Sequence, residues 1–203
     1  MPDITVERAI ELRRIEQASV TVDIEGKTPV IPHKWSEKAI RMMADKQSAA
    51  PGALKNKRAP KDPEQEAHDS CYWLAPGQPG MPATAFKAAM VGACRFFEGL
   101  TMTAAKLLFY VEGEGPDQLV AIKGDPIMRT DTPRNATGVA DLRYRYSFYP
   151  WAATLTVRFL PSVITQDSVL SLLDAAGYGG VGDWRPSAPK SATGTFGQFG
   201  VVS

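Results

Sequence analysis

Alternating apolar and polar residues predict several β-strands in this chain. The alternation covers 19–24, 142–148 and 151–159. A period of two places the apolar side chains on one face of a half-buried strand. Pro150 separates the last two stretches, so we expect them to pair as an antiparallel hairpin around a tight turn. A short apolar run at 198–202 predicts a final strand.

Apolar residues at intervals of three or four predict two long helices. The first covers residues 83–98 and includes Phe97 in its apolar stripe. The second covers 165–176, where Thr165 is a typical N-cap and Gly177 is a typical residue for the helix end. Each helix lies between segments that predict strands.

Three segments interrupt this pattern, and we expect residues 1–203 to form one domain that contains them. Residues 47–81 are rich in Pro, Ala and Lys and predict a flexible insertion loop. Two apolar runs within 104–122 flank a Gly- and Asp-containing turn and predict a hairpin insertion. Residues 124–138 predict a polar loop, and 177–200 form a glycine-rich loop.

The predicted elements follow a β-α-β-β-α-β order, which is that of the ferredoxin-like split βαβ fold. This is an α+β, RRM-like class with an antiparallel sheet. We expect the sheet to contain 19–24, 142–148, 151–159 and 198–202, with both helices on one of its faces.

Positive and negative charges nearly cancel over the whole chain but are unevenly distributed along it. The formal net charge is +1, whereas residues 34–61 contain eight Lys or Arg and two acids, a local charge of +6. Such a segment fits a polyanionic partner, and it fits a solvated surface equally well. With no signal peptide and no long apolar run, the sequence predicts a cytoplasmic protein without a membrane partner.

Arginines on the predicted strands are candidates for binding phosphate. Arg143 and Arg145 lie two residues apart on one strand face, about 7 Å from each other, and Arg158 is expected on the neighbouring strand. That row suits successive phosphates of a single strand. The alternative is a solvent-exposed sheet face with positive side chains.

The glycine-rich loop contains an aromatic and a cationic residue side by side. Seven glycines lie between Gly177 and Val202, and Trp184 precedes Arg185. Glycine allows positive φ and close approach of another chain. Trp184 either covers the edge of the core or stacks on a base, and Arg185 is expected to contact a ligand.

Two short motifs in this loop resemble a known family. Gly180-Val-Gly182 and Gly194-Thr-Phe-Gly197-Gln-Phe199 resemble the two halves of the C-terminal glycine-rich loop of the RAMP superfamily, the ferredoxin-like RNA-binding proteins of CRISPR effector complexes. The resemblance extends over the fold order and about 25 residues of motif. It implies a protein that grips a nucleic-acid backbone and polymerises along it. Gly26-Lys-Thr-Pro29 and Trp184-Arg185-Pro186 resemble small phage-type proteins.

Few residue patterns in the sequence favour catalysis or metal binding. His33 and His68 are the only histidines, and no second cluster accompanies the group of His68, Asp69 and Cys71. We therefore expect no metal, no cofactor and no catalytic residues. Because some RAMP proteins cut RNA with a histidine, the resemblance makes His33 the candidate if the chain is a RAMP-like endoribonuclease.

The sequence thus predicts a non-enzymatic protein that binds single-stranded nucleic acid, RNA rather than DNA, and assembles as repeated subunits. A phage structural or assembly protein that forms homo-oligomers is the alternative. The residues expected at the nucleic-acid site are Lys55, Lys57, Arg58, Arg129, Arg134, Arg143, Arg145, Arg158, Gly182, Trp184, Arg185 and Lys190.

Overall fold

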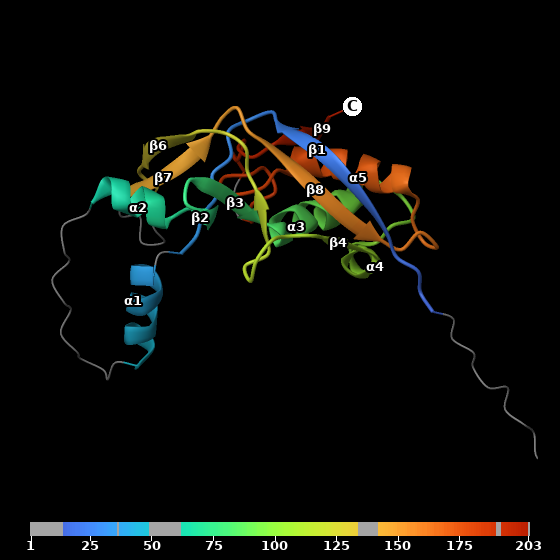
Figure 1. Cartoon of the computed structure of the whole chain (residues 1–203), viewed down its shortest axis with the longest axis horizontal. Coiled ribbons are helices and arrows are strands. Elements are labelled where there is room, and N and C mark those ends of the chain that lie inside the picture. Colours follow the sequence, from blue (N-terminus) through green and yellow to red (C-terminus); the bar gives the residue numbers. More distant parts are fainter. Residues whose placement is uncertain (1–13, 36, 49–61, 134–141, 190–191, 203) are drawn as a thin grey trace, which may run out of the picture.

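A four-stranded antiparallel sheet forms the centre of the computed structural model, which describes residues 14–35, 37–48, 62–133, 142–189 and 192–202 (Figure 1). Its order is β4-β8-β1-β9, with β1 (Ala18–Gly26), β4 (Phe109–Val111), β8 (Ala152–Phe159) and β9 (Phe199–Val201). β1 pairs with β8 from Ala18 opposite Phe159 to Glu25 opposite Ala152. Since β8 and β9 are both antiparallel to β1, they run in the same direction on either side of it.

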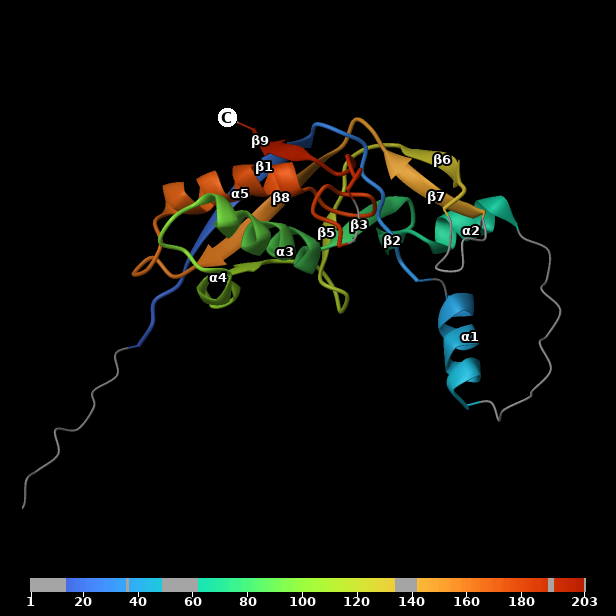
Figure 2. The same cartoon turned by 180° about the vertical axis from the view of Figure 1, so that it is seen from behind.

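Two helices, α3 (Ala83–Ala93) and α5 (Gln166–Gly179), cover one face of this sheet (Figure 2). The order β1-α3-β4-β8-α5-β9 is the β-α-β-β-α-β order, so the ferredoxin-like α+β prediction is confirmed. Thr165 caps α5 as expected, accepting a hydrogen bond from the Ser168 amide at 3.2 Å. The helix continues past Gly177, and the residue with positive φ at its end is Gly180.

The predicted hairpin between 142–148 and 151–159 is wrong. The first of these strands is β7 (Arg143–Phe148), and it pairs with β6 (Pro126–Asp131) in a separate two-stranded sheet. The second, β8, has β1 on one edge and β4 on the other, which leaves no edge for β7. The polar loop expected at 124–138 therefore contains a strand.

The hairpin insertion predicted for 104–122 is formed only at its turn, where Glu114 bridges Leu119. Thr101 caps a short helix, α4 (Met102–Leu108), which takes up the first part of the apolar run. The rest of the run forms β4 in the main sheet. β5 (Leu119–Ala121) instead pairs with β3 (Gln78–Pro82).

Residues 47–81 are not one continuous loop. A helix, α2 (Pro63–Asp69), is followed by β2 (Tyr72–Ala75), and β2, β3 and β5 form a three-stranded sheet. Residues 49–61, on which the flexibility prediction mainly falls, lie outside the described residues. The remaining elements are α1 (Glu37–Ser48) and a 3-10 turn, η1 (Cys94–Phe96), which ends the helix predicted for 83–98.

None of the helices in the described part of the chain is long and apolar enough to cross a membrane.

Candidate functional site

The glycine-rich loop is fixed against the segment that follows β1. The Gly197 amide donates to the Pro29 carbonyl at 2.7 Å, and the Asp183 amide donates to the Ile31 carbonyl at 2.9 Å. Gly197 has a φ of +69°, and a Cβ there would lie 1.8 Å from the Val181 carbonyl oxygen. Glycine is required at this position because backbone from both halves of the loop meets there.

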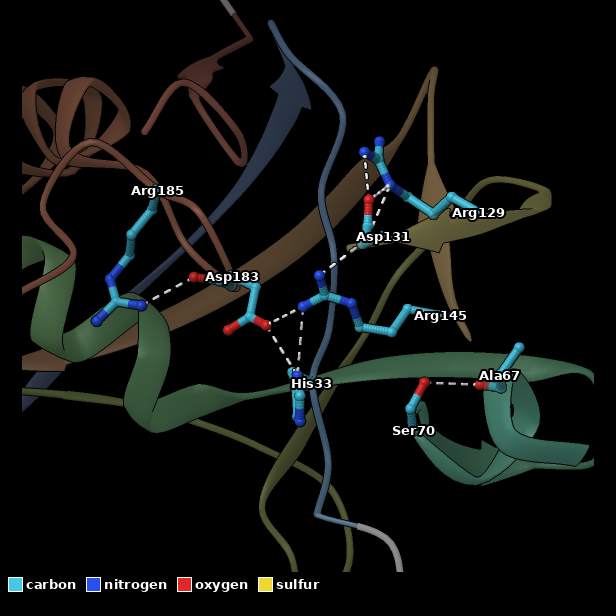
Figure 3. Close-up of polar contacts among 9 residues, drawn as sticks. His33, Ala67, Ser70, Arg129, Asp131, Arg145, Asp183 and Arg185 are labelled. Atoms are coloured by element: carbon cyan, nitrogen blue, oxygen red, sulfur yellow. Dashed lines mark hydrogen bonds and ion pairs between the residues drawn. The ribbon is translucent and has the colours of Figure 1, made fainter. Parts of the chain in front are cut away.

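An ionic network joins this loop to the β6–β7 sheet (Figure 3). Arg145, only 2% exposed, donates to the carboxylates of Asp131, at 2.8 Å, and Asp183. Asp131 also accepts from Arg129 at 2.9 Å. A buried guanidinium needs paired carboxylates, because an uncompensated charge in the interior is strongly unfavourable. Arg145 therefore holds the loop in place.

Trp184 packs against the same arginines. Its ring centroid lies 4.8 Å from the Arg145 guanidinium carbon and 5.3 Å from that of Arg129. The Phe196 ring meets it edge-on at 5.6 Å. These distances suit cation–π contacts with the ionic network, and stacking of Trp184 on a base stays a prediction.

A cleft with a volume of about 440 Å³ lies between residues 181–189 of the glycine-rich loop and α3. Arg185 lines it and uses one of its five N–H donors on the Gly182 carbonyl, at 2.8 Å. Arg95, which follows α3, also lines the cleft. Other lining residues are His33, Tyr72, Met81, Thr84, Ala88, Gly92, Met102, Asp183 and Ser187.

His33 connects the ionic network to the cleft. Its Nδ1 lies 2.8 Å from Asp183 Oδ2, with the imidazole donating to the carboxylate, while the ring lines the cleft. Burial by itself raises the pKa of Asp183. The hydrogen bond and charge of His33, together with the charges of Arg145 and Arg143, outweigh burial and hold this pKa below its usual value of 3.8. Asp183 is therefore an anion that orients His33.

The expected row of Arg143 and Arg145 on one strand and Arg158 on its neighbour is not formed. Arg145 is buried in the network, and Arg158 lies on β8, in the main sheet, bonded to Glu112. The reason is the pairing of β7 with β6, which separates 142–148 from β8. Contact of Arg143 or Arg158 with phosphate stays a prediction.

Other predicted site residues gather around the loop. Arg129 comes from β6 and packs against Trp184, and the Gly182 carbonyl accepts a hydrogen bond from Arg185 within the loop. Five predicted residues lie outside the described residues: Lys55, Lys57, Arg58, Arg134 and Lys190.

Sequence reasoning missed several members of the site. Asp131 and Asp183 carry no motif, and the His33–Asp183 pair spans 150 residues. Arg95 had a detectable signal, because it lies off the apolar stripe of its helix. In the described residues, no three His, Cys, Asp or Glu side chains converge as metal ligands would.

Comparisons with known proteins give no family assignment. No protein-family model matches the sequence, and no curated protein matches it. Among solved structures, a chain of "Cryo-EM structure of the Type III-B Cmr-beta bound to cognate target RNA" is 12% identical with a TM-score of 0.47; the match covers 92% of this chain and 59% of that one. Cmr6 from Pyrococcus furiosus is 9% identical with a TM-score of 0.39, over 93% and 100% of the two chains.

The protein spans less than two thirds of the length of the first of these chains. Its own sheet order and site define the class of protein: an α+β, ferredoxin-like chain whose glycine-rich loop borders a cleft on the helical side of the sheet.

Proposed function

We propose that this protein binds single-stranded nucleic acid in the cleft between the glycine-rich loop and α3, and that it prefers RNA to DNA. The observation that carries the proposal is that Arg185, Arg95 and Tyr72 line one cleft. Guanidinium groups bind phosphate through several N–H donors, and an aromatic ring accepts a stacked base.

The opposite face of the main sheet is a poorer candidate. The side chains that β1 presents there are Ser19, Thr21, Asp23 and Glu25, all exposed. Arg158 on the neighbouring strand is bonded to Glu112. Carboxylates repel a phosphate backbone, so this face favours neither affinity nor steering.

A preference for RNA is supported by hydroxyl groups at the cleft. Thr84 and Ser187 both line it and are both exposed. A hydroxyl can donate to or accept from the ribose 2′-OH, which is the group that distinguishes RNA from DNA at a binding site.

Fluorescence anisotropy with a labelled uridine oligomer tests this proposal. The log of the affinity should fall with the log of the salt concentration by about 0.7 for each phosphate neutralised. Arg185→Ala and Arg95→Ala should each weaken binding and reduce the slope by about that amount. The matched control is Arg158→Ala, which removes an arginine from the other face.

Equal losses of affinity in all three variants would contradict the proposed site. Tighter binding of the matching DNA oligomer would contradict the preference for RNA. An absence of binding by the unaltered protein would refute the function.

We further propose that copies of the protein line up along the strand. Support comes from Leu107, which is 82% exposed on α4 next to the edge strand β4. An exposed apolar side chain beside a sheet edge is suited to contact with another copy. Light scattering should show larger particles when a long RNA is added, and Leu107→Glu should reduce them. Large particles that form equally well without RNA would instead favour the structural or assembly protein.

A second candidate function is metal-independent cleavage of RNA, and the His33–Asp183 pair is the observation that favours it. A carboxylate that orients an imidazole is the arrangement of a general acid or base. In this reaction the ribose 2′-oxygen loses its proton and attacks the adjacent phosphorus. The 5′-oxygen leaves and takes up a proton, so the products are a 2′,3′-cyclic phosphate and a 5′-hydroxyl.

His33 would transfer one of these two protons. Incubation of labelled RNA should give cyclic-phosphate ends that disappear with His33→Ala and with a 2′-deoxy substrate. Intact RNA after prolonged incubation with the unaltered protein would leave binding as the whole function.

A further inference from the structure

Two consecutive phenylalanines are exposed where α3 ends, at one end of the cleft. Phe96 is 63% exposed and Phe97 is 42% exposed. The cause is a turn at the helix end, which the Phe97 amide closes by donating to the carbonyl of Cys94 at 3.1 Å. Cys94 is buried, and the turn places the side chains of Phe96 and Phe97 outside the core. The sequence had predicted Phe97 in the apolar stripe, so its exposure is a correction. Arg95, immediately before the pair, lines the cleft.

A third aromatic side chain is exposed at the other end of the cleft. Trp35 is 60% exposed, and its ring centroid lies 6.2 Å from that of His33, which lines the cleft. Exposed Lys34 precedes it. Each end of the cleft therefore has an exposed aromatic group next to a cation in sequence.

The two ends are separated by the length of α3. His33 is bonded to Asp183, whose neighbour Gly182 lies against Met81, just before the helix begins. Arg95 lies in η1, two residues after the last residue of α3, so Thr84 and Arg95 are about 16 Å apart along the axis. The cleft can hold only a few nucleotides, and a longer strand must leave it at both ends.

We propose that these aromatic groups are stacking platforms: bases that leave the cleft stack on Trp35 at one end and on Phe96 and Phe97 at the other. This inference rests on the proposed function. Aromatic rings exposed to water are unfavourable, and a base has an apolar face that covers them irrespective of its sequence. The adjacent Lys34 and Arg95 favour a polyanion over an apolar protein partner.

Oligouridines that carry 2-aminopurine at one end or the other test the two platforms separately. Stacking on an aromatic ring quenches this fluorophore. Trp35→Ala should restore fluorescence at one end only, and Phe96→Ala/Phe97→Ala should restore it at the opposite end only. For a strand longer than the cleft, each variant should lose affinity by about 5-fold to 150-fold per stacked base. An oligomer short enough to remain within the cleft should bind all variants equally.

The matched control is Tyr110→Ala, since Tyr110 is an aromatic residue of similar exposure to Phe97 but lies on β4 beside Arg158. Trp35→Phe and Phe96→Tyr/Phe97→Tyr retain a ring and should retain quenching. If the unaltered protein binds the long oligomer and the alanine variants bind it equally well, the platforms are refuted while the proposed function stands. A loss of self-association in light scattering with unchanged RNA affinity would show that the phenylalanines contact protein instead.

Discussion

Arg145 is the single residue on which the geometry of the site depends most. Its guanidinium lies between Asp131 and Asp183, and its plane packs beside Trp184. The sequence could predict a cation at this position but not its burial, because no pattern pairs Arg145 with Asp131 on β6 or with Asp183 in the glycine-rich loop. Alternation alone cannot distinguish an exposed arginine from one that lies beneath a loop folded back from far along the chain.

Asp131→Ala should destabilise the fold strongly. The Asp131 carboxylate is almost fully buried and pairs with both Arg145 and Arg129. Removal of Asp131 leaves Arg145 with only the more exposed Asp183 and takes the buried carboxylate from Arg129, and breaking a buried ion pair costs about 3–5 kcal/mol. Urea unfolding followed by circular dichroism measures this loss. Asp183→Ala is the comparison and should cost less, because its carboxylate is more exposed and Arg145 keeps Asp131. A loss below about 1 kcal/mol for Asp131→Ala would contradict the buried pair.

Stability should also depend on Asp183 in acid. Its folded-state pKa is below the usual 3.8, so its contribution is present above that value and is lost as the pH falls through it towards the folded pKa. Between about pH 5 and pH 2, Asp183→Asn should therefore show a smaller decline in unfolding free energy than the unaltered protein. Identical pH profiles for the two proteins would rule out a depressed pKa.

At the level of elements, periodicity predicted the strands and helices whose own residues determine their conformation. β1, β8 and α5 were predictable because an alternating pattern or a capped apolar stripe continues over each whole element. β3 and β6 were not, since Pro79, Gly80 and Pro126 interrupt any alternation. These strands form because neighbouring strands supply hydrogen bonds, and the partner of a strand cannot be read from its own residues.

The glycine-rich loop permits a test of close approach between backbones. Gly197→Ala introduces a Cβ at a positive φ of +69° and only 1.8 Å from the Val181 carbonyl oxygen. Gly77→Ala has a similar φ, +76°, with nothing within 4 Å. The second variant should cost about 1–2 kcal/mol from conformation alone. The first should cost clearly more and should weaken RNA binding, measured by unfolding and by anisotropy. Equal effects would mean that the loop does not need this packing.

For the whole molecule, the order of elements was predictable but one strand of the sheet was assigned wrongly. β4 has only three residues, and α4 takes the apolar residues before it. β7 carries the clearer pattern yet lies in another sheet, because β1 and β4 already occupy the edges of β8. In the site, Arg185 and the loop glycines came from the sequence. The His33–Asp183 pair and the cleft required the fold to bring distant segments together.

Photo-crosslinking with 4-thiouridine RNA, followed by mass spectrometry of the linked peptides, tests the central claim most directly. The helical side of the sheet carries the cleft, and the opposite side carries exposed acids on β1. We expect cross-links on α3, on residues 181–189 of the loop and on Tyr72 or Met102, and we expect unlabelled RNA to compete them away. Cross-links confined to the outer face of β1 and β8 would contradict the proposed binding site.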